Sequence, residues 1–261
     1  MAIIEKHAPG SFCWIELATT DQVAAKTFYS SLFGWTANDF PMGPNDLYTI
    51  FKLEGRDAAA GYTLRPDDRA KGVPPHWMLY IQVESADDAA AKAEKLGAKV
   101  LAPAFDVMDV GRMTVLQDPT GAIFVAWQSK GHSGIGIAGV PGTLCWADLS
   151  TPDPDRGKEF YSALFGWKIE VGENDKSGYM HIQNGDTLIG GIPPAQFRNP
   201  NAPPHWMIYI QVSDVDATTA QAKSQGGKAY MEPSSMEGVG RLAIIADPQG
   251  AAFAIFKSAR G

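Results

Sequence analysis

The sequence predicts an α+β fold of four successive β-α-β-β-β modules, arranged as two tandem halves. The first observation behind this prediction is a decapeptide, PPHWMLYIQV at 74–83, which returns at 203–212 with one Leu-to-Ile change. The second is FYSSLFGW at 28–35, which returns as FYSALFGW at 160–167. Only two copies of such a long unit are present, so the pattern indicates duplication of a domain rather than a solenoid.

Each half begins with a module that opens on a strand, FCWIELAT in the first half. A helix from Asp21 to Phe33 follows, with Thr20 or Asp21 as N-cap and Gly34 in the C′ position. Two short β-rich runs, LYTIFKLEG and AAAGYTL, continue the module. The second strand of this module has the weakest pattern.

The second module of each half opens on the decapeptide as a strand. In the first half, SADDAAAKAEKLG predicts a helix that ends at Gly97, and KVLAPAF, RMTVLQD and AIFVAWQ predict three strands. The segment GHSGIGIAGVPG has the glycine density of a linker. We therefore predict a first domain at 1–130, a linker at 131–142 and a second domain at 143–261.

Composition and charge limit the partners. Hydrophobic residues make up 45% of the chain and charged residues 20%, as in soluble globular domains. A net charge of −7 argues against nucleic acid or an anionic membrane as partner, since both attract a basic face. The only cysteines, Cys13 and Cys145, predict buried thiols in a reducing compartment. With no signal peptide and no run of about 18 apolar residues, we expect a cytoplasmic protein.

The module order, the FYSSLFGW and FYSALFGW helices and the DPTGAIFV and DPQGAAFA turns resemble the vicinal oxygen chelate superfamily. This superfamily includes glyoxalase I, bleomycin-resistance proteins and extradiol dioxygenases. The Trp-x-acid-Leu opening strand is similar to that of a two-domain glyoxalase-like subgroup related to a mycobacterial culture-filtrate antigen. The resemblance implies two tandem glyoxalase-like domains with cupped mixed sheets. Helices would cover the convex face, and the small-molecule site would lie on the concave one.

Strand alternation predicts which side chains line the cup, because successive residues point to opposite faces. In the decapeptide the uniformly apolar set should pack under the helices, namely Trp77, Leu79, Ile81 and Val83. The mixed set should face the cup, namely His76, Met78, Tyr80 and Gln82. The other residues predicted to face inward are Phe12, Trp14, Glu16, Leu144, Trp146, Asp148, His205, Met207, Tyr209 and Gln211.

The resemblance also implies where a metal would bind, and these positions hold no ligands. They fall on Trp14, Trp146, Met78, Met207, Val125 and Ala254, and around Gly61/Tyr62 and Gly191/Ile192. None of these side chains suits a divalent ion. We therefore expect no metal and no other cofactor. A less favoured alternative is a shifted site built from Glu16 or Asp148 with His76 or His205, and with His181 as third ligand.

An aromatic lining with one carboxylate and one imidazole in each half suits a planar or partly apolar organic ligand. The proposed ligand-binding residues are Trp14, Trp146, Met78, Tyr80, Met207, Tyr209, Arg112 and Arg241. The alternative for the tryptophans is that they fill the cup. For the two arginines it is an ordinary surface ion pair, and for the histidines a hydrogen bond that braces a turn.

Two functions of different class remain open. The first is a bleomycin-resistance-like protein that binds a small organic molecule without metal, and we favour it. The second is a glyoxalase-like lyase, isomerase or hydroxylase-type enzyme. In that enzyme His205 or His76 would act as general base, and Glu16 or Asp148 as acid or orienting group. The sequence leaves the oligomeric state open, a dimer included.

Overall fold

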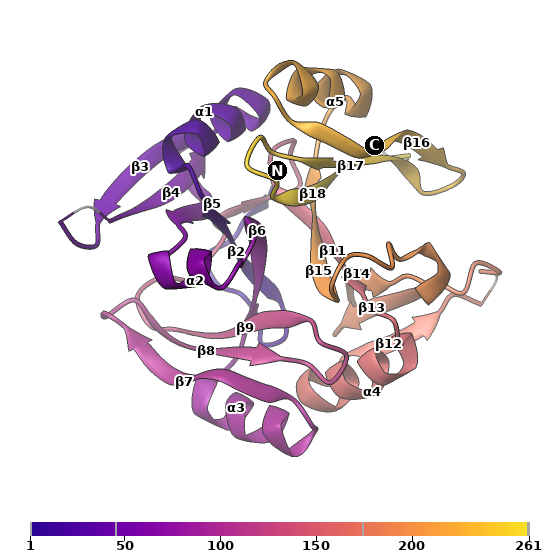
Figure 1. Cartoon of the computed structure of the whole chain (residues 1–261). Coiled ribbons are helices and arrows are strands. Elements are labelled where there is room, and N and C mark those ends of the chain that lie inside the picture. Colours follow the sequence, from indigo (N-terminus) through magenta and orange to yellow (C-terminus); the bar gives the residue numbers. More distant parts are fainter. Residues whose placement is uncertain (1, 45, 174, 260–261) are drawn as a thin grey trace.

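The computed structural model describes residues 2–44, 46–173 and 175–259, so the outermost ends of the two predicted domains lie outside the described residues. Figure 1 shows two sheets with helices packed on them. The first half runs β2 (Phe12–Thr19), α1 (Gln22–Phe33), β3 (Thr36–Pro41), β4 (Leu47–Leu53), β5 (Arg56–Thr63), α2 (Pro66–Ala70), β6 (His76–Gln82), α3 (Ala86–Lys95), β7 (Lys99–Val107), β8 (Gly111–Gln117) and β9 (Ile123–Ser129). The second half runs β11 (Leu144–Ser150), α4 (Pro154–Phe165), β12 (Lys168–Val171), β13 (Met180–Asn184), β14 (Thr187–Ile192), the 3-10 helix η1 (Ala195–Phe197), β15 (His205–Gln211), α5 (Val215–Ser224), β16 (Lys228–Met236), β17 (Gly240–Ala246) and β18 (Ala252–Ser258).

Each half builds its own eight-stranded mixed sheet. The strand orders are β3-β4-β5-β2-β6-β9-β8-β7 and β12-β13-β14-β11-β15-β18-β17-β16. In the first sheet the two modules join where β2 pairs antiparallel with β6, while β2–β5 and β6–β9 are parallel. The predicted α+β fold of four modules in two tandem domains is confirmed. The modules pair within each half. No described helix is long and apolar enough to span a membrane.

The predicted ends of the first helix are confirmed in detail. Asp21 is the N-cap of α1 and accepts a hydrogen bond from the amide of Ala24. The helix ends at Gly34, whose φ of 70° lies in the left-handed region that glycine adopts without strain. In the second half, Asp153 and Gly166 hold the corresponding positions of α4.

The helix-covered sides of the two sheets face each other, with α1 beside α5 and α3 beside α4 (Figure 1). At this interface the buried hydroxyl of Tyr29 donates to Asp247 Oδ2 across the halves at 3.0 Å. The same hydroxyl accepts from Trp77 Nε1 at 3.1 Å. The same arrangement recurs with the halves exchanged. The hydroxyl of Tyr161 donates to Asp118 Oδ2 and accepts from Trp206 Nε1, both at 2.9 Å. The repeated FYSSLFGW and DPTG segments therefore join the two halves.

The tryptophans that close the same motif extend this junction. Trp35 Nε1 donates to the carbonyl of Gly142 at 2.8 Å, just before the second sheet begins. Trp167 Nε1 donates to the carbonyl of Gly10 at 2.9 Å, just before the first. Each half thus forms a hydrogen bond to the residues that lead into β2 or β11 of the other half.

The predicted linker packs against the first half. Its strand β10 (Ile137–Ala138) pairs with β1 (Ala2–Ile3) near the N-terminus, and Ile135 and Ile137 are buried. His7 lies against this segment, with Nε2 at 2.9 Å from the carbonyl of Ile135. Residues 131–142 are therefore part of the folded structure.

Two inward predictions, Phe12 and Leu144, were wrong, because these residues lie opposite Ile81 and Ile210 of the helix-covered sides. The register of β2 against β6 shifts between Phe12 and Trp14, and such a bulge reverses the alternation. The ring of Phe12 lies against Trp167 and Trp206 of the second half, with centroid distances of 5.7 and 5.5 Å. Phe12 therefore fills the interface between the halves and does not line the concave face.

Candidate ligand site on the concave sheet faces

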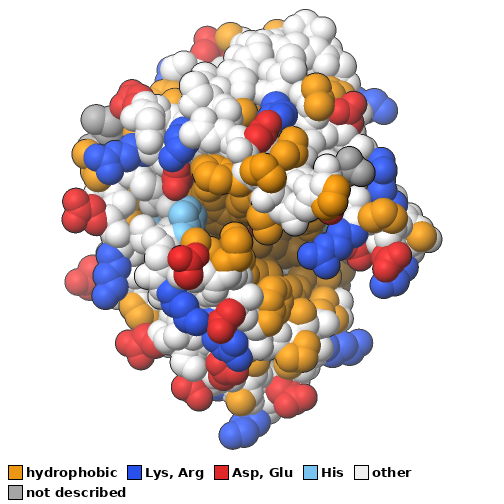
Figure 2. Space-filling view, turned by 90° about the vertical axis from the view of Figure 1, so that its left-hand side faces the viewer, with side chains coloured by type: hydrophobic (Ala, Val, Ile, Leu, Met, Phe, Trp, Pro, Cys, Tyr) orange, Lys and Arg blue, Asp and Glu red, His pale blue; other side chains and the backbone are white. Residues whose placement is uncertain are grey.

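The concave face of the first sheet gathers most of the residues predicted for it. Across β2 and β6, Trp14 lies opposite Tyr80, and Glu16 lies opposite Met78. We call the concave face around these four residues the first cup. Figure 2 views the molecule from the side of the first half and shows a hollow lined by hydrophobic side chains, with a histidine at its edge.

Glu16 is the central polar group of the first cup. Its side chain is buried, and Oε2 accepts a hydrogen bond from the hydroxyl of Tyr80. Burial raises the pKa of the Glu16 carboxyl to about 7, although the bond from Tyr80 acts in the opposite direction. Trp14 lies beside it and donates from Nε1 to the hydroxyl of Tyr48 at 3.2 Å. The first cup therefore holds a carboxyl group that changes protonation near neutral pH.

Asp148 occupies the same place in the second half but has more partners. Oδ1 accepts from the hydroxyl of Tyr179 at 2.5 Å and from Trp146 Nε1 at 3.0 Å. Oδ2 accepts from the hydroxyl of Tyr209 at 2.7 Å, and Met207 lies opposite Asp148 across the strands. Burial raises the pKa of Asp148, and the three hydrogen bonds oppose that rise. We call Asp148, Trp146, Tyr179 and Tyr209 the Asp148 cage.

Gly191 makes room for the cage. A Cβ built at this position would lie 2.0 Å from the hydroxyl oxygen of Tyr179. We expect Gly191→Ala to destabilise the protein by about 1–3 kcal/mol through overpacking. Urea denaturation would measure this loss, and Gly172→Ala, where the nearest atom lies at 3.6 Å, is the matched control. Adding Tyr179→Leu should recover part of the lost stability. Equal stability of Gly191→Ala and the control would contradict the steric argument.

The two repeated histidines brace turns and do not pair with the carboxylates. His76 Nδ1 lies 2.8 Å from the carbonyl of Pro74, and His205 Nδ1 lies 2.8 Å from that of Pro203. His76 is opposite Ala18, so it lies two residues, or roughly 7 Å, along the strand from the level of Glu16. Burial lowers the pKa of His205. Among the described residues, therefore, neither His76 nor His205 forms a hydrogen-bonded pair with Glu16 or Asp148.

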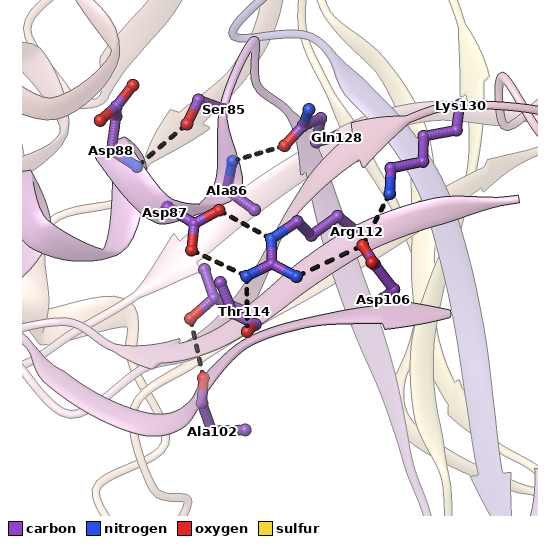
Figure 3. Close-up of polar contacts among 11 residues, drawn as sticks. Ser85, Ala86, Asp87, Asp88, Ala102, Asp106, Arg112, Thr114, Gln128 and Lys130 are labelled. Atoms are coloured by element: carbon purple, nitrogen blue, oxygen red, sulfur yellow. Dashed lines mark hydrogen bonds and ion pairs between the residues drawn. The ribbon is translucent and has the colours of Figure 1, made fainter. Parts of the chain in front are cut away.

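The two predicted ligand-binding arginines lie on the helix side of their sheets. Figure 3 shows Arg112 against Asp87, with Nε and Nη2 at 2.7 and 2.8 Å from its carboxylate oxygens, and against Asp106 at 3.3 Å. Arg241 makes the equivalent bidentate pair with Asp216, both distances being 2.6 Å. Asp87 and Asp216 stand in the first turns of α3 and α5. Both guanidinium groups therefore fasten a helix to a sheet and point away from the cups.

His132 of the predicted linker reaches the first cup, which the sequence did not indicate. Its ring meets that of Trp14 edge to face, with centroids 4.7 Å apart, and Nε2 lies 3.1 Å from Asp57 Oδ2. His132 and, to a smaller extent, Lys52 lower the pKa of Asp57. A histidine in a glycine-rich segment carries no local signal of this contact. Tyr179 was also missed, because it precedes β13 and falls outside any strand pattern.

The described residues do not assemble a metal centre. Among them, no three His, Cys, Asp or Glu side chains lie close enough to share one ion. Of the positions where the family resemblance would place ligands, Trp14 and Val125 both lie beside Tyr80, and Met78 lies two residues along β6, opposite Glu16. The available donor set therefore does not fit the divalent ion that the resemblance implies.

Comparison with known proteins places the fold. A model of the Glyoxalase/Bleomycin resistance protein/Dioxygenase superfamily matches residues 11–125 and 143–255. "Putative glyoxylase CFP32" of Mycobacterium tuberculosis is 40% identical over 262 residues, or 97% of each chain. "Anthracycline biosynthesis protein DnrV" of Streptomyces peucetius is 31% identical over 270 residues, covering 98% of this chain and 96% of that protein.

Solved structures show the same architecture at low identity. The Mn(II)-bound glyoxalase from Novosphingobium aromaticivorans has a TM-score of 0.64 and 17% identity, over 95% of this chain and 82% of that one. The 2,3-dioxygenase LapB from Pseudomonas sp. KL28 has a TM-score of 0.66 and 14% identity, over 96% and 93%. With both repeats matched by the family model and a relative at 40% identity, the chain belongs to the Glyoxalase/Bleomycin resistance protein/Dioxygenase superfamily.

Proposed function

We propose that this protein binds a planar, largely apolar organic molecule on a concave sheet face without a resident metal. The proposal is supported by the aromatic and apolar side chains at the positions where the family resemblance would place metal ligands. Trp14 and Tyr80 stand together around the buried Glu16 carboxyl. Indole and phenol rings offer flat apolar surface, and a single polar group fixes the orientation of a ligand.

The relatives suggest a chemical class for the ligand. Two of them carry names that refer to anthracycline biosynthesis, and anthracyclines contain a planar polycyclic aromatic system. A fused-ring quinone would stack on the aromatic lining and present its edge to Glu16.

The two cysteines are free thiols, which suits the reducing cytoplasm that we propose as the location.

Binding of 2-aminoanthraquinone tests the proposal, because this compound has no pair of oxygens arranged to chelate a metal. We expect saturable quenching of tryptophan fluorescence, unchanged by EDTA and by added Mg²⁺, Zn²⁺ or Fe²⁺. A Trp14→Leu variant should lose most of the affinity, since it removes an indole from the lining. Binding that requires a divalent ion would contradict the proposal.

The protonation of Glu16 favours a second candidate, an enzyme of lyase or isomerase type. A carboxyl with a pKa of about 7 can exchange a proton with a bound substrate at neutral pH. His76 and His205 are tied to turns, so Glu16 would act without them. In this case wild-type protein would speed exchange of solvent deuterium into an acidic C–H of a bound carbonyl compound, as followed by mass spectrometry, while Glu16→Gln would bind the same compound without exchange. Absence of exchange by wild-type protein leaves the binding function.

A further inference from the structure

We propose that His132, oriented by Asp57, takes a proton from the ligand of the first cup, so that the ligand is a planar aromatic compound with an acidic hydroxyl group. The compound would bind as its phenolate beside an imidazolium ion. This inference rests on the proposed function and deepens it, since it names the functional group by which the ligand is recognised.

His132 lies on the concave face of the first sheet because its ring packs on Trp14. The two ring centroids are 4.7 Å apart, with 82° between the ring planes. Trp14 lies opposite Tyr80, and its Nε1 donates to the hydroxyl of Tyr48. The side chain of His132 is 24% exposed, so it is accessible from solvent at this wall of the first cup.

Hydrogen bonds to the backbone fix the position of this histidine. Its carbonyl oxygen accepts from Trp127 Nε1 at 3.2 Å and from Ser129 Oγ at 2.9 Å. Its amide donates to the carbonyl of Val110 at 3.0 Å. A side chain that is already held in place loses little freedom when a ligand binds, which favours recognition.

Asp57 decides which ring nitrogen of His132 carries the proton. Nε2 lies 3.1 Å from Asp57 Oδ2, and an ionised carboxylate only accepts, so the neutral ring is protonated on Nε2. Nδ1 then has a free lone pair and bonds to none of the described residues. It is also not among their polar atoms that are buried without a partner. Nδ1 is therefore an exposed acceptor, as a proton-accepting group requires.

The charges that face His132 favour the imidazolium ion. His132 and, to a smaller extent, Lys52 lower the pKa of Asp57, so this carboxyl is ionised at neutral pH, and it also pairs with Lys52. Burial lowers the pKa of the nearby His7, which is therefore neutral under the same conditions. Glu16 is protonated below its pKa of about 7. A proton on His132 thus gains the Asp57 carboxylate as its partner, and the Lys52 ammonium is the one cation that opposes it.

The proton transfer is balanced within the complex. The O–H bond of the ligand breaks, an N–H bond forms at Nδ1, and the electron pair stays on the ligand oxygen. The imidazolium ion then donates from Nδ1 to this phenolate and from Nε2 to Asp57. Charge-assisted hydrogen bonds are stronger than neutral ones, so the phenolate binds more tightly than the phenol.

Binding of 2-hydroxyanthraquinone to the whole chain tests this assignment, because its visible absorption changes when the hydroxyl group ionises. The compound has no pair of oxygens arranged to chelate a metal. We expect the bound compound to ionise with a midpoint at least about one pH unit below that of the free compound. By linkage this shift equals about tenfold tighter binding of the phenolate than of the phenol. His132→Gln should abolish the shift.

Three comparisons separate His132 from its neighbours. His76→Gln is the matched control, since His76 is tied to the carbonyl of Pro74, and it should keep the full shift. Lys52→Met should keep most of the shift, because the positive charge on His132 remains. 2-Methylanthraquinone, which has no proton to give, should bind wild-type protein and His132→Gln equally well and so show that the variant is folded.

Nitrogen NMR of labelled protein tests the orientation of the ring without a ligand. The neutral His132 ring should carry its proton on Nε2, and a proton on Nδ1 would overturn the inference. An unshifted midpoint in wild-type protein, or a shift lost in Lys52→Met and kept in His132→Gln, would also overturn it while leaving metal-free binding in place. Failure of the amino, hydroxy and methyl compounds alike to bind would contradict the proposed function, and this inference with it.

Discussion

Replacing Tyr29 or Tyr161 by Phe is expected to lower the free energy of unfolding by roughly 2–3 kcal/mol at each site. The reason is that one hydroxyl serves two buried partners. Without it, Asp247 Oδ2 loses the donor on Tyr29, and Trp77 Nε1 loses its acceptor. The cost of leaving such groups unsatisfied in a buried interface exceeds the value of an ordinary hydrogen bond. Urea denaturation of each variant would measure the loss.

The double variant of Tyr29 and Tyr161 should show whether the two halves unfold together. Because both hydroxyls bridge the halves, we expect the unfolding transition of the double variant to broaden or split. Tyr230→Phe is the matched control, since Tyr230 is 62% exposed. If the interface variants are as stable as this control, the hydroxyls do not join the halves as described.

Replacing Glu16 by Gln should remove a pH dependence of stability between pH 4.5 and about 7. The pKa of Glu16 rises from an ordinary value of 4.5 to about 7, chiefly because burial disfavours the ionised form. In this interval the folded protein binds more protons than the unfolded chain, so stability falls as the pH rises. The fall is complete above pH 7 and amounts to roughly 3 kcal/mol.

The measurement is the difference between wild-type and Glu16→Gln stability at a series of pH values. Asp148 and Asp247 also have raised pKa values, and their contributions cancel in this difference. The exposed Glu94→Gln provides the control and should give a difference that changes little with pH. A curve for Glu16→Gln that parallels the control would show that the buried carboxyl titrates normally.

Much of the architecture could be predicted because the repeated segments mark the equivalent strands and helices of the two halves. Alternation in the decapeptide correctly separated the side of Trp77, which packs under α1, from the side of Tyr80, which meets Glu16. The cap residues Asp21 and Gly34 predicted the ends of the first helix, because capping depends on residue types that can be read from the sequence. These features depend on neighbouring residues in the chain.

The features that were missed depend on contacts between distant segments. The bulge before Trp14 turned Phe12 toward the second half. His132 reaches Trp14 only because the linker folds back on the first sheet. A duplication also copies residues of a functional site and residues of the interface between the halves alike. The motif that contains Tyr29 therefore indicated a family but not that Tyr29 joins the halves. Nor could it show that Gly191 makes room for Tyr179 beside Asp148.

A native mass spectrum of protein purified without chelators or metal-affinity resin, recorded with 2-aminoanthraquinone, tests the central claim most directly. The account predicts a metal-free chain that carries the compound. A stoichiometric divalent ion, or an adduct that forms only when such an ion is present, would contradict it.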